Sequence, residues 1–326
     1  LSSSSAASDV YKRQLKKQAA YLFTKMNLEN TVIFHLSAGM CMAHRMAVIS
    51  EINSALERKH KNPDAPKVVC ISTQVIEAGV DVSFGCVIRL CAGLDSVIQA
   101  AGRCNRNGEL NGAADVFIIN CRGEDLGMLR SIKDGKMACM SLLSDCKYHP
   151  EKYPSGLTSD EAVYAYYKKL YIQSDIGAQD MPIKIDGSPF TLFDLLSLDR
   201  TYANAPYLKA NGEKYALTQA FKTAGSRFTV FGSRTTDVIV PYGEGKEIIA
   251  ELGSKRAEED IKYLKKLIKE ARAYTVSLYE NQRRALADSG ALHPIADGIA
   301  LALSEEFYNE AFGLNLDGES REAITL

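Results

Sequence analysis

Long apolar runs, paired cysteines and a dominant charge are all missing from this sequence. No apolar stretch approaches the roughly 20 residues that a membrane-spanning helix needs, so no membrane contact is expected. The 40 acidic and 39 basic residues give a net charge of −1, which excludes a strongly basic nucleic-acid binder but permits a local basic groove. The composition is that of a globular chain and excludes disordered, collagen-like and coiled-coil proteins.

Cysteine occurs eight times, but no two cysteines form a CxxC pair. A zinc site is therefore not expected, and neither is any other bound metal. All eight cysteines lie before residue 147, mostly within apolar strand or helix patterns. This distribution is typical of buried free thiols in a reducing compartment, so we expect a cytoplasmic protein.

Three motifs of nucleotide and nuclease chemistry are also missing. The chain has no GxxxxGK[ST] phosphate loop, no DExD/H box for magnesium and no His-Asp metal pair. The Gly-Lys pair in GEGKE (243–247) lacks the spacing and the Ser/Thr of a phosphate loop. We interpret it as a turn that opens a helix.

The first part of the chain alternates between short apolar runs and amphipathic segments. This alternation predicts an α/β fold with a parallel sheet, Rossmann-like or RecA-like. The predicted strands are 31–37, 67–73, 86–90 and 114–120. The predicted helices are 15–29, 43–59, 74–79 and 95–106.

Beyond residue 125 the pattern becomes mostly helical. Two β-rich runs around GSRTTD (227–242) predict a hairpin, residues 247–284 predict a helix, and about 295–312 predict a final amphipathic helix. We therefore expect a mostly helical α+β C-terminal domain. The expected divisions are 1–14 (an assembly scar or disordered), 15–125 (the α/β domain), 126–200 (a helical linker region) and 201–326 (the C-terminal accessory domain).

The first cluster of chemistry-bearing residues is STQVIEAGVD (72–81), which begins where a predicted strand ends. Ligands bind at the carboxyl ends of strands in open α/β sheets. Ser72 or Thr73 is a natural helix N-cap, so its hydroxyl and the helix amides could face a phosphate. The alternative is a capped helix closed by Gly79, with Glu77 and Asp81 in solvent.

The second cluster is QAAGRCNRNG (99–108). On a helix, Gln99, Arg103 and Arg106 stand at i, i+4 and i+7 and share one face, and Gly102 permits a close backbone approach. Two fixed guanidiniums suit phosphoryl transfer, in which an arginine finger contributes about 10³–10⁵ in rate. The alternative is a solvated arginine face.

Together the two clusters resemble motifs V and VI of superfamily 2 DExD/H-box helicases. The resemblance is closer to the CRISPR-associated helicase–nuclease of type I systems, through LCAGLDSVIQAAGRCNRNGE (90–109) and HLSAGMCMAHR (35–45). Later blocks, FKTAGSRFTVF and VIVPYGEGKEII, also resemble that family. The resemblance implies a second RecA-like helicase domain, N-terminally truncated, with a C-terminal domain after it. The expected subtype is I-C.

This resemblance implies a role for each matching residue. Arg103 and Arg106 would be arginine fingers and Gln99 would position the nucleotide, although Ala100 stands where many members carry a further arginine. Glu77, Gly79, Asp81 and Gly102 would couple nucleotide state to strand movement. Packing is the alternative for the two histidines among the implied DNA contacts, which are His35, Ser37, His44, Arg45, Ser72, Thr73 and Gln74.

The implied cofactors are ATP and Mg²⁺, bound mainly by a preceding domain and not by this fragment alone. The implied partners are single-stranded DNA, the missing first RecA-like and nuclease domains, and a CRISPR surveillance complex. The chain would be the C-terminal half of an ATP-dependent DNA helicase or translocase, inactive by itself. The alternatives are a non-enzymatic helicase-like DNA-binding or docking module, or another superfamily 2 helicase.

Two further surfaces have competing interpretations. The Lys-rich segment 255–272 could line a DNA path, but interleaved acidic residues favour a solvated helix face. Four tyrosines could stack on bases, but their spacing favours a helix core; they are Tyr164, Tyr166, Tyr167 and Tyr171.

Overall fold

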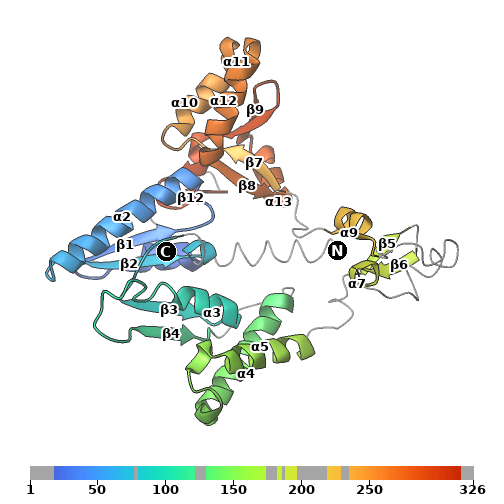
Figure 1. Ribbon diagram of the computed structural model, residues 1–326. Helices are drawn as coiled ribbons and strands as arrows, with labels where there is room; N and C mark the ends of the chain where they lie inside the picture. The colour runs from blue at the N-terminus through green and yellow to red at the C-terminus, as the bar shows by residue number, and fades with distance from the viewer. Residues whose placement is uncertain are drawn as a thin grey trace. The chain divides into compact units, whose positions relative to one another are not determined.

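The computed structural model describes residues 18–76, 80–121, 130–173, 182–185, 188–196, 219–228 and 235–316 (Figure 1). Contacts divide the chain into two compact units. The first comprises Leu1–Leu90, Ser96–Ile119 and Ser233–Leu326, and the second comprises Cys91–Asp95 and Asn120–Gly232.

The first strand pair of the α/β part is β1 (Thr31–Leu36) and β2 (Lys67–Ser72), which run parallel. The connecting helix is α2 (Met42–Lys61). Its last turn is rich in basic side chains, which favour a helix C-terminus, and the chain leaves at Asn62 before a proline. The predicted strand–helix–strand order is confirmed here.

The second strand pair repeats this arrangement. Strands β3 (Cys86–Leu90) and β4 (Asp115–Ile119) are parallel, and α3 (Leu94–Ala101) lies between them in sequence. Parallel neighbours joined by helices confirm the α/β class predicted from the alternation. Residues 18–25 are helical, within the predicted 15–29.

The C-terminal part of the first unit contains a four-stranded sheet in the order β8-β7-β10-β9. Strand β7 (Thr235–Ile239) pairs antiparallel with β8 (Thr275–Tyr279) and parallel with β10 (Ala300–Leu303). The described partners of β7 therefore both come from later in the chain. In the hairpin predicted at 227–242, most of the first β-rich run and the turn (229–234) lie outside the described residues, so the hairpin stays a prediction.

The single helix predicted over 247–284 is also wrong. The segment forms α10 (Gly245–Leu252), α11 (Lys255–Glu259) and α12 (Ile261–Ala271), followed by β8 and then α13 (Glu280–Asp288). Side-chain caps restart the helix twice. Ser254 accepts a hydrogen bond from the amide of Ala257, and Asp260 accepts from the amides of Lys262 and Tyr263.

The final helix predicted over about 295–312 is absent from the described residues. Strand β9 (Leu292–Ile295) turns back into β10, and Ala296, Asp297 and Gly298 have φ values of 51°, 53° and 79°. Three successive left-handed residues cannot continue a right-handed helix. The chain then forms a short antiparallel pair, β11 (Tyr308–Asn309) and β12 (Gly313–Leu314).

Two apolar clusters stabilise this part of the first unit. One gathers Cys41 with Val238, Val240 and Leu278 of the sheet region and with Tyr308. The other lies under α10–α12. Its buried members are Ile239, Ile248, Leu252, Ala257, Leu267 and Ala271. Because Cys41 directly precedes α2, the first cluster links the α/β part to the C-terminal sheet.

The second unit is largely helical, as predicted for the region after residue 125. Its described elements are α4 (Arg130–Tyr148), α5 (Asp160–Gln173), α7 (Leu192–Leu196), α9 (Phe221–Arg227), β5 (Pro182–Ile185) and β6 (Ser188–Thr191). Of the four tyrosines predicted to form a helix core, only Tyr166 is buried. Helix α5 packs through one face, which leaves the other three exposed; they are Tyr164, Tyr167 and Tyr171.

The eight cysteines are free thiols, but only Cys41, Cys91 and Cys139 are buried. Burial raises the pKa of the half-buried Cys70 thiol to about 12, so this thiol stays protonated at neutral pH. Within the described residues, none of the helices combines the length and the apolar character that crossing a bilayer demands.

Candidate functional site

The second cluster lies at the end of α3. The helix stops at Ala101, and the following amides bond to nearer carbonyls, Arg103 N–H to Ala100 O at 3.0 Å and Cys104 N–H to Ala101 O at 2.9 Å. The chain then runs beside Phe84. The amide of Phe84 donates to Arg103 O at 2.9 Å, and the amide of Asn105 donates to Phe84 O at 2.8 Å.

This geometry corrects the predicted helix over 95–106. Arg103 and Arg106 lie beyond α3, so a shared helix face does not bring them together with Gln99. Pairing with Phe84 uses the backbone groups that a continued helix would need. Asn105 adopts a left-handed φ of 45°, and its side-chain amide bonds to the Leu110 and Gly112 carbonyls, which completes the turn.

The two arginines have different environments. Arg103 is 9% exposed, and its Nε donates to the carbonyl of Ile76 at 3.1 Å. Arg106 is exposed, and its Nε lies 3.2 Å from the Asp81 carboxylate. Both contacts reach the first cluster, so the two clusters form one site. Gln99 and Gly102 are exposed at the end of α3.

The first cluster begins where β2 ends. Thr73 donates its amide to Leu36 O at 3.1 Å, which continues the β1–β2 ladder by one step. The Ser72 hydroxyl bonds to Thr73 O at 2.8 Å. Among the described residues, the buried Thr73 Oγ1 has no hydrogen-bond partner. A short turn of 3₁₀ helix, η1 (Gln74–Ile76), follows, with Gln74 exposed.

Asp81 contacts two further elements. Its carboxylate is 83% exposed where it meets Arg106, and its backbone carbonyl accepts from the Asn53 side chain of α2 at 3.2 Å. Asn53 was not predicted as part of this site, because no local pattern distinguishes it from other polar residues of an amphipathic helix. The predicted coupling residues Glu77 and Gly79 lie outside the described residues.

The predicted DNA contacts at 35–45 mostly face the C-terminal hairpin, which we define as residues 308–314. His44 is 2% exposed; its Nε2 donates to Glu310 O and its Nδ1 accepts from the Tyr308 hydroxyl, both at 2.9 Å. The same hydroxyl accepts from the amide of Cys41 at 3.0 Å. The His44 ring stacks on Tyr242, with ring centroids 4.2 Å apart.

His35 and Ser37 meet the same hairpin. Nδ1 of His35 donates to Ala311 O at 3.1 Å, and the Ser37 hydroxyl donates to Phe312 O at 3.4 Å. His35 Nε2 is buried, with no hydrogen-bond partner among the described residues. These contacts favour the packing interpretation for both histidines. No nearby pattern in the sequence could have identified partners some 270 residues away.

Burial sets the protonation of both histidines. Burial lowers the pKa of His44, against a smaller opposing effect of the Glu310 carbonyl and carboxylate. Burial also lowers the pKa of His35, against the Ala311 carbonyl, and the neighbouring His44 lowers it further. Both rings are therefore neutral at pH 7, which suits hydrogen bonding within the protein.

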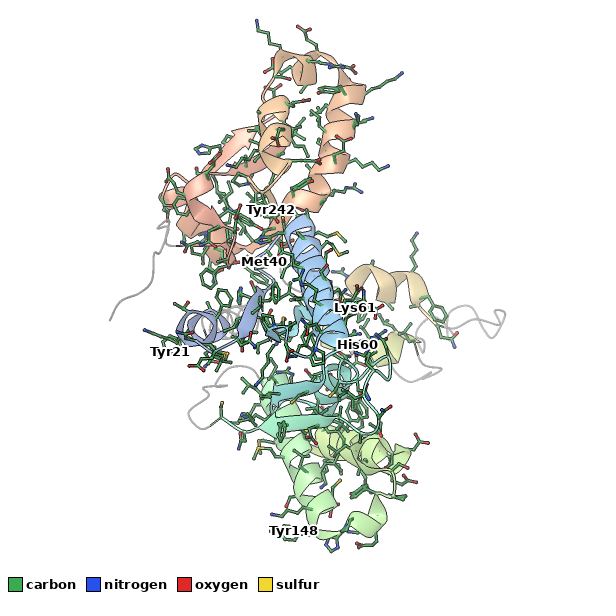
Figure 2. The ribbon with its side chains drawn as sticks, turned by 90° about the vertical axis from the view of Figure 1, so that its left-hand side faces the viewer. Tyr21, Met40, His60, Lys61, Tyr148 and Tyr242 are labelled. Atoms are coloured by element: carbon green, nitrogen blue, oxygen red, sulfur yellow. The ribbon has the colours of Figure 1, made fainter. Side chains whose placement is uncertain are left out.

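Figure 2 shows where the stacking of His44 on Tyr242 lies along α2: Met40 and Tyr242 are at the N-terminal end of this helix, and His60 and Lys61 are at its other end.

Arg45, in the first turn of α2, is half-buried, and its Nε has no partner among the described residues. No three His, Cys, Asp or Glu side chains gather as a metal site in the part of the chain that the structure describes.

Comparison with known proteins finds sequences and structures that are similar to this part of the chain. Residues 8–109 match the profile described as CRISPR-associated nuclease/helicase Cas3, C-terminal. A 41-residue stretch is 66% identical to the CRISPR-associated nuclease/helicase Cas3 of Haloferax volcanii; it covers 13% of this chain and 4% of that protein.

Two solved structures have a distant likeness to the chain. One is Cas3 of T. fusca with ATP, at 12% identity and a TM-score of 0.44, covering 92% of this chain and 34% of the other. The second is a CRISPR RNA-guided surveillance complex, pre-nicking, at 13% identity and a TM-score of 0.45, covering 93% of this chain and 39% of the other. The chain thus spans about a third of these proteins. The sequence matches are local: over residues 8–109, the chain is similar to the C-terminal part of the CRISPR-associated nuclease/helicase Cas3.

Proposed function

We propose that this chain is the C-terminal half of an ATP-dependent DNA helicase or translocase that acts in CRISPR interference in the cytoplasm. The full-length protein would add a nuclease and a first RecA-like domain. The observation that supports this best is the contact between Arg106 and Asp81, which joins the two clusters within the segment that is similar to Cas3.

Arg106 is the arginine finger that this geometry favours. An ion pair between exposed side chains contributes only about 0–1 kcal/mol, so a triphosphate can displace Asp81 at small cost. The guanidinium would then stabilise the charge that spreads over the γ-phosphate oxygens. Arg103 is held on Ile76 O, so it would act as the second cation and fix the turn, while the exposed Gln99 meets the nucleotide.

The preceding domain would hold most of ATP and Mg²⁺, and the metal ion neutralises developing charge on the β- and γ-oxygens when bound. This chain would couple the hydrolysis of ATP to a movement of its own DNA-contacting segment. When Arg106 leaves Asp81, the segment bonded to Asn53 of α2 would be free to shift. Glu77, Gly79 and Gly102 are the other residues that we propose for this coupling. Of the proposed DNA contacts, Gln74 is exposed and Ser72, Thr73 and Arg45 are half-buried, whereas the C-terminal hairpin covers His35, Ser37 and His44.

The proposal is tested by supplying the missing half. We expect the chain alone to release no phosphate from ATP. Fused behind the first RecA-like domain of a Cas3-family protein, it should hydrolyse ATP at least about tenfold faster with single-stranded DNA than without it. DNA-stimulated hydrolysis by the isolated chain would contradict the proposal, and so would a fusion without DNA-dependent hydrolysis.

A second candidate is a non-enzymatic docking module. Two observations favour a docking module: Arg103 is buried, and the C-terminal hairpin bonds to His44. Neither feature requires a bound nucleotide. A fusion that binds single-stranded DNA but hydrolyses no ATP is the result that this candidate predicts.

A further inference from the structure

Helix α12 carries a row of lysines that the proposed function does not use. Its lysine stripe, defined as Lys262, Lys265, Lys266 and Lys269, follows the i, i+3, i+4, i+7 spacing of a single helix face. All four side chains are exposed, and Arg272 extends the row into the next turn. From Lys262 to Lys269 the stripe covers about 10 Å along the helix axis.

The core fixes the direction of this face. Leu267 and Ala271 are buried, and Leu264 and Ile268 pack beside them against α10. The helix begins at a firm N-cap, where Asp260 accepts amide hydrogen bonds at 2.9 and 3.1 Å. The lysine stripe therefore cannot turn inward, and it presents its ammonium groups to solvent.

Neighbouring acids offset little of this charge. Glu270, 3.7 Å from Lys266, is the one carboxylate that forms an ion pair with the stripe among the described residues. Glu258 and Glu259 lie on α11, beyond the N-terminal end of the stripe. Like charges at i, i+3 and i, i+4 destabilise a helix by about 0.2–0.5 kcal/mol per pair, so the stripe has a cost that a polyanion would remove.

We propose that the lysine stripe binds the sugar–phosphate backbone of duplex DNA without reading its sequence. Lysine ammoniums are point charges on flexible stems, which suit phosphates in any register. The one aromatic residue of α12, Tyr263, is half-buried with the Arg256 guanidinium 4.1 Å from its ring centroid, so α12 itself offers no open ring on which single-stranded bases could stack. Backbone charge is then the whole attraction, and a duplex carries one charge per about 1.7 Å of its axis.

The inference takes DNA as the substrate class from the proposed function, but its test needs no ATP and no second domain. The full 326-residue chain is titrated into a fluorescent duplex of about 20 base pairs over about 50–200 mM salt. In the stripe variant, all four lysines are changed to glutamine, which has a similar helix propensity. The control variant carries the same change at Lys61, Lys67, Lys147 and Lys168, exposed lysines of other elements.

The stripe variant should bind the duplex at least tenfold more weakly, and its slope of log affinity against log salt should fall by about 3–4. The control variant should match the parent chain. If the stripe variant unfolds at a lower temperature than the parent chain, the double variant Lys265→Gln with Lys269→Gln replaces it. The fall in its slope of log affinity against log salt should be about half of that expected for the stripe variant.

Three results would overturn the inference. The first is a stripe variant that binds the duplex as the parent does. The second is a parent chain that does not bind the duplex. The third is equal affinity of the parent chain for the duplex and for a matched single strand. Each leaves the ATPase test of the proposed function untouched.

Discussion

Arg103 and Arg106 are three residues apart, yet one is buried on a backbone carbonyl and the other is exposed beside a carboxylate. Sequence spacing predicted that both would face the same ligand. The residue types, and the start of the first cluster at the end of a strand, were predictable from the two motifs. Their division of roles was not, because it depends on a backbone pairing with Phe84 that no local pattern encodes.

The Tyr308 hydroxyl is a residue-scale test of the hairpin contact. Tyr308→Phe leaves the Cys41 amide and His44 Nδ1 without partners in a buried site, so we expect the free energy of unfolding to fall by about 1–3 kcal/mol. Tyr242→Phe keeps the ring stacked on His44 and is the matched control. Urea denaturation measures both, and equal loss in the two variants would contradict a role for the Tyr308 hydroxyl.

The buried histidines predict how stability depends on pH. Their folded-state pKa values lie below the ordinary 6.5, so below that pH the unfolded chain binds more protons than the folded one. Stability is therefore fully present above about pH 6.5 and declines as the pH falls toward the lowered values. Urea midpoints from pH 8 down to about pH 5 should show this decline, and His44→Gln should reduce its slope. The exposed His60→Gln is the control; an unchanged slope in His44→Gln would exclude His44 as a source.

At the scale of elements, the strands were the most predictable part of the fold. β1–β4 are short, β-branched runs bounded by turn residues, and each lies within or equals its predicted range. The C-terminal elements were not predictable, because β7 pairs with strands about 40 and 60 residues later. Caps at Ser254 and Asp260 also divided a continuous amphipathic pattern into separate helices.

Gly313 tests whether the C-terminal hairpin docks as one element on the 37–40 turn. Its φ is 76°, and an added Cβ would collide with the carbonyl of Gly39, where Leu314 N–H also bonds at 2.8 Å. Gly313→Ala should cost about 3 kcal/mol or more of unfolding free energy. Gly290→Ala has a similar φ of 71° with open space around it, so it should cost only about 1 kcal/mol. An equal loss of unfolding free energy in the two variants would mean that the hairpin does not pack closely against the 37–40 turn.

On the scale of the whole molecule, the C-terminal sheet is part of the same unit as the α/β segments. Cys41 lies in the core cluster of that sheet, and the hairpin bonds to His35, Ser37 and His44, for which the family resemblance implied DNA contacts. We therefore expect the C-terminal part to hold the first turn of α2 in place and to limit which residues reach DNA.

In the proposed function, Arg106 serves hydrolysis of ATP bound by a preceding domain. This role is tested by measuring kcat for ATP hydrolysis by the fusion with a first RecA-like domain, compared between Arg106→Gln and the control Lys61→Gln. We expect a loss of about 10³-fold or more for Arg106→Gln, with nearly unchanged ATP affinity, because an arginine finger acts on the transition state. The control should keep the parent rate. An Arg106→Gln fusion that hydrolyses ATP within about threefold of its parent would contradict the account.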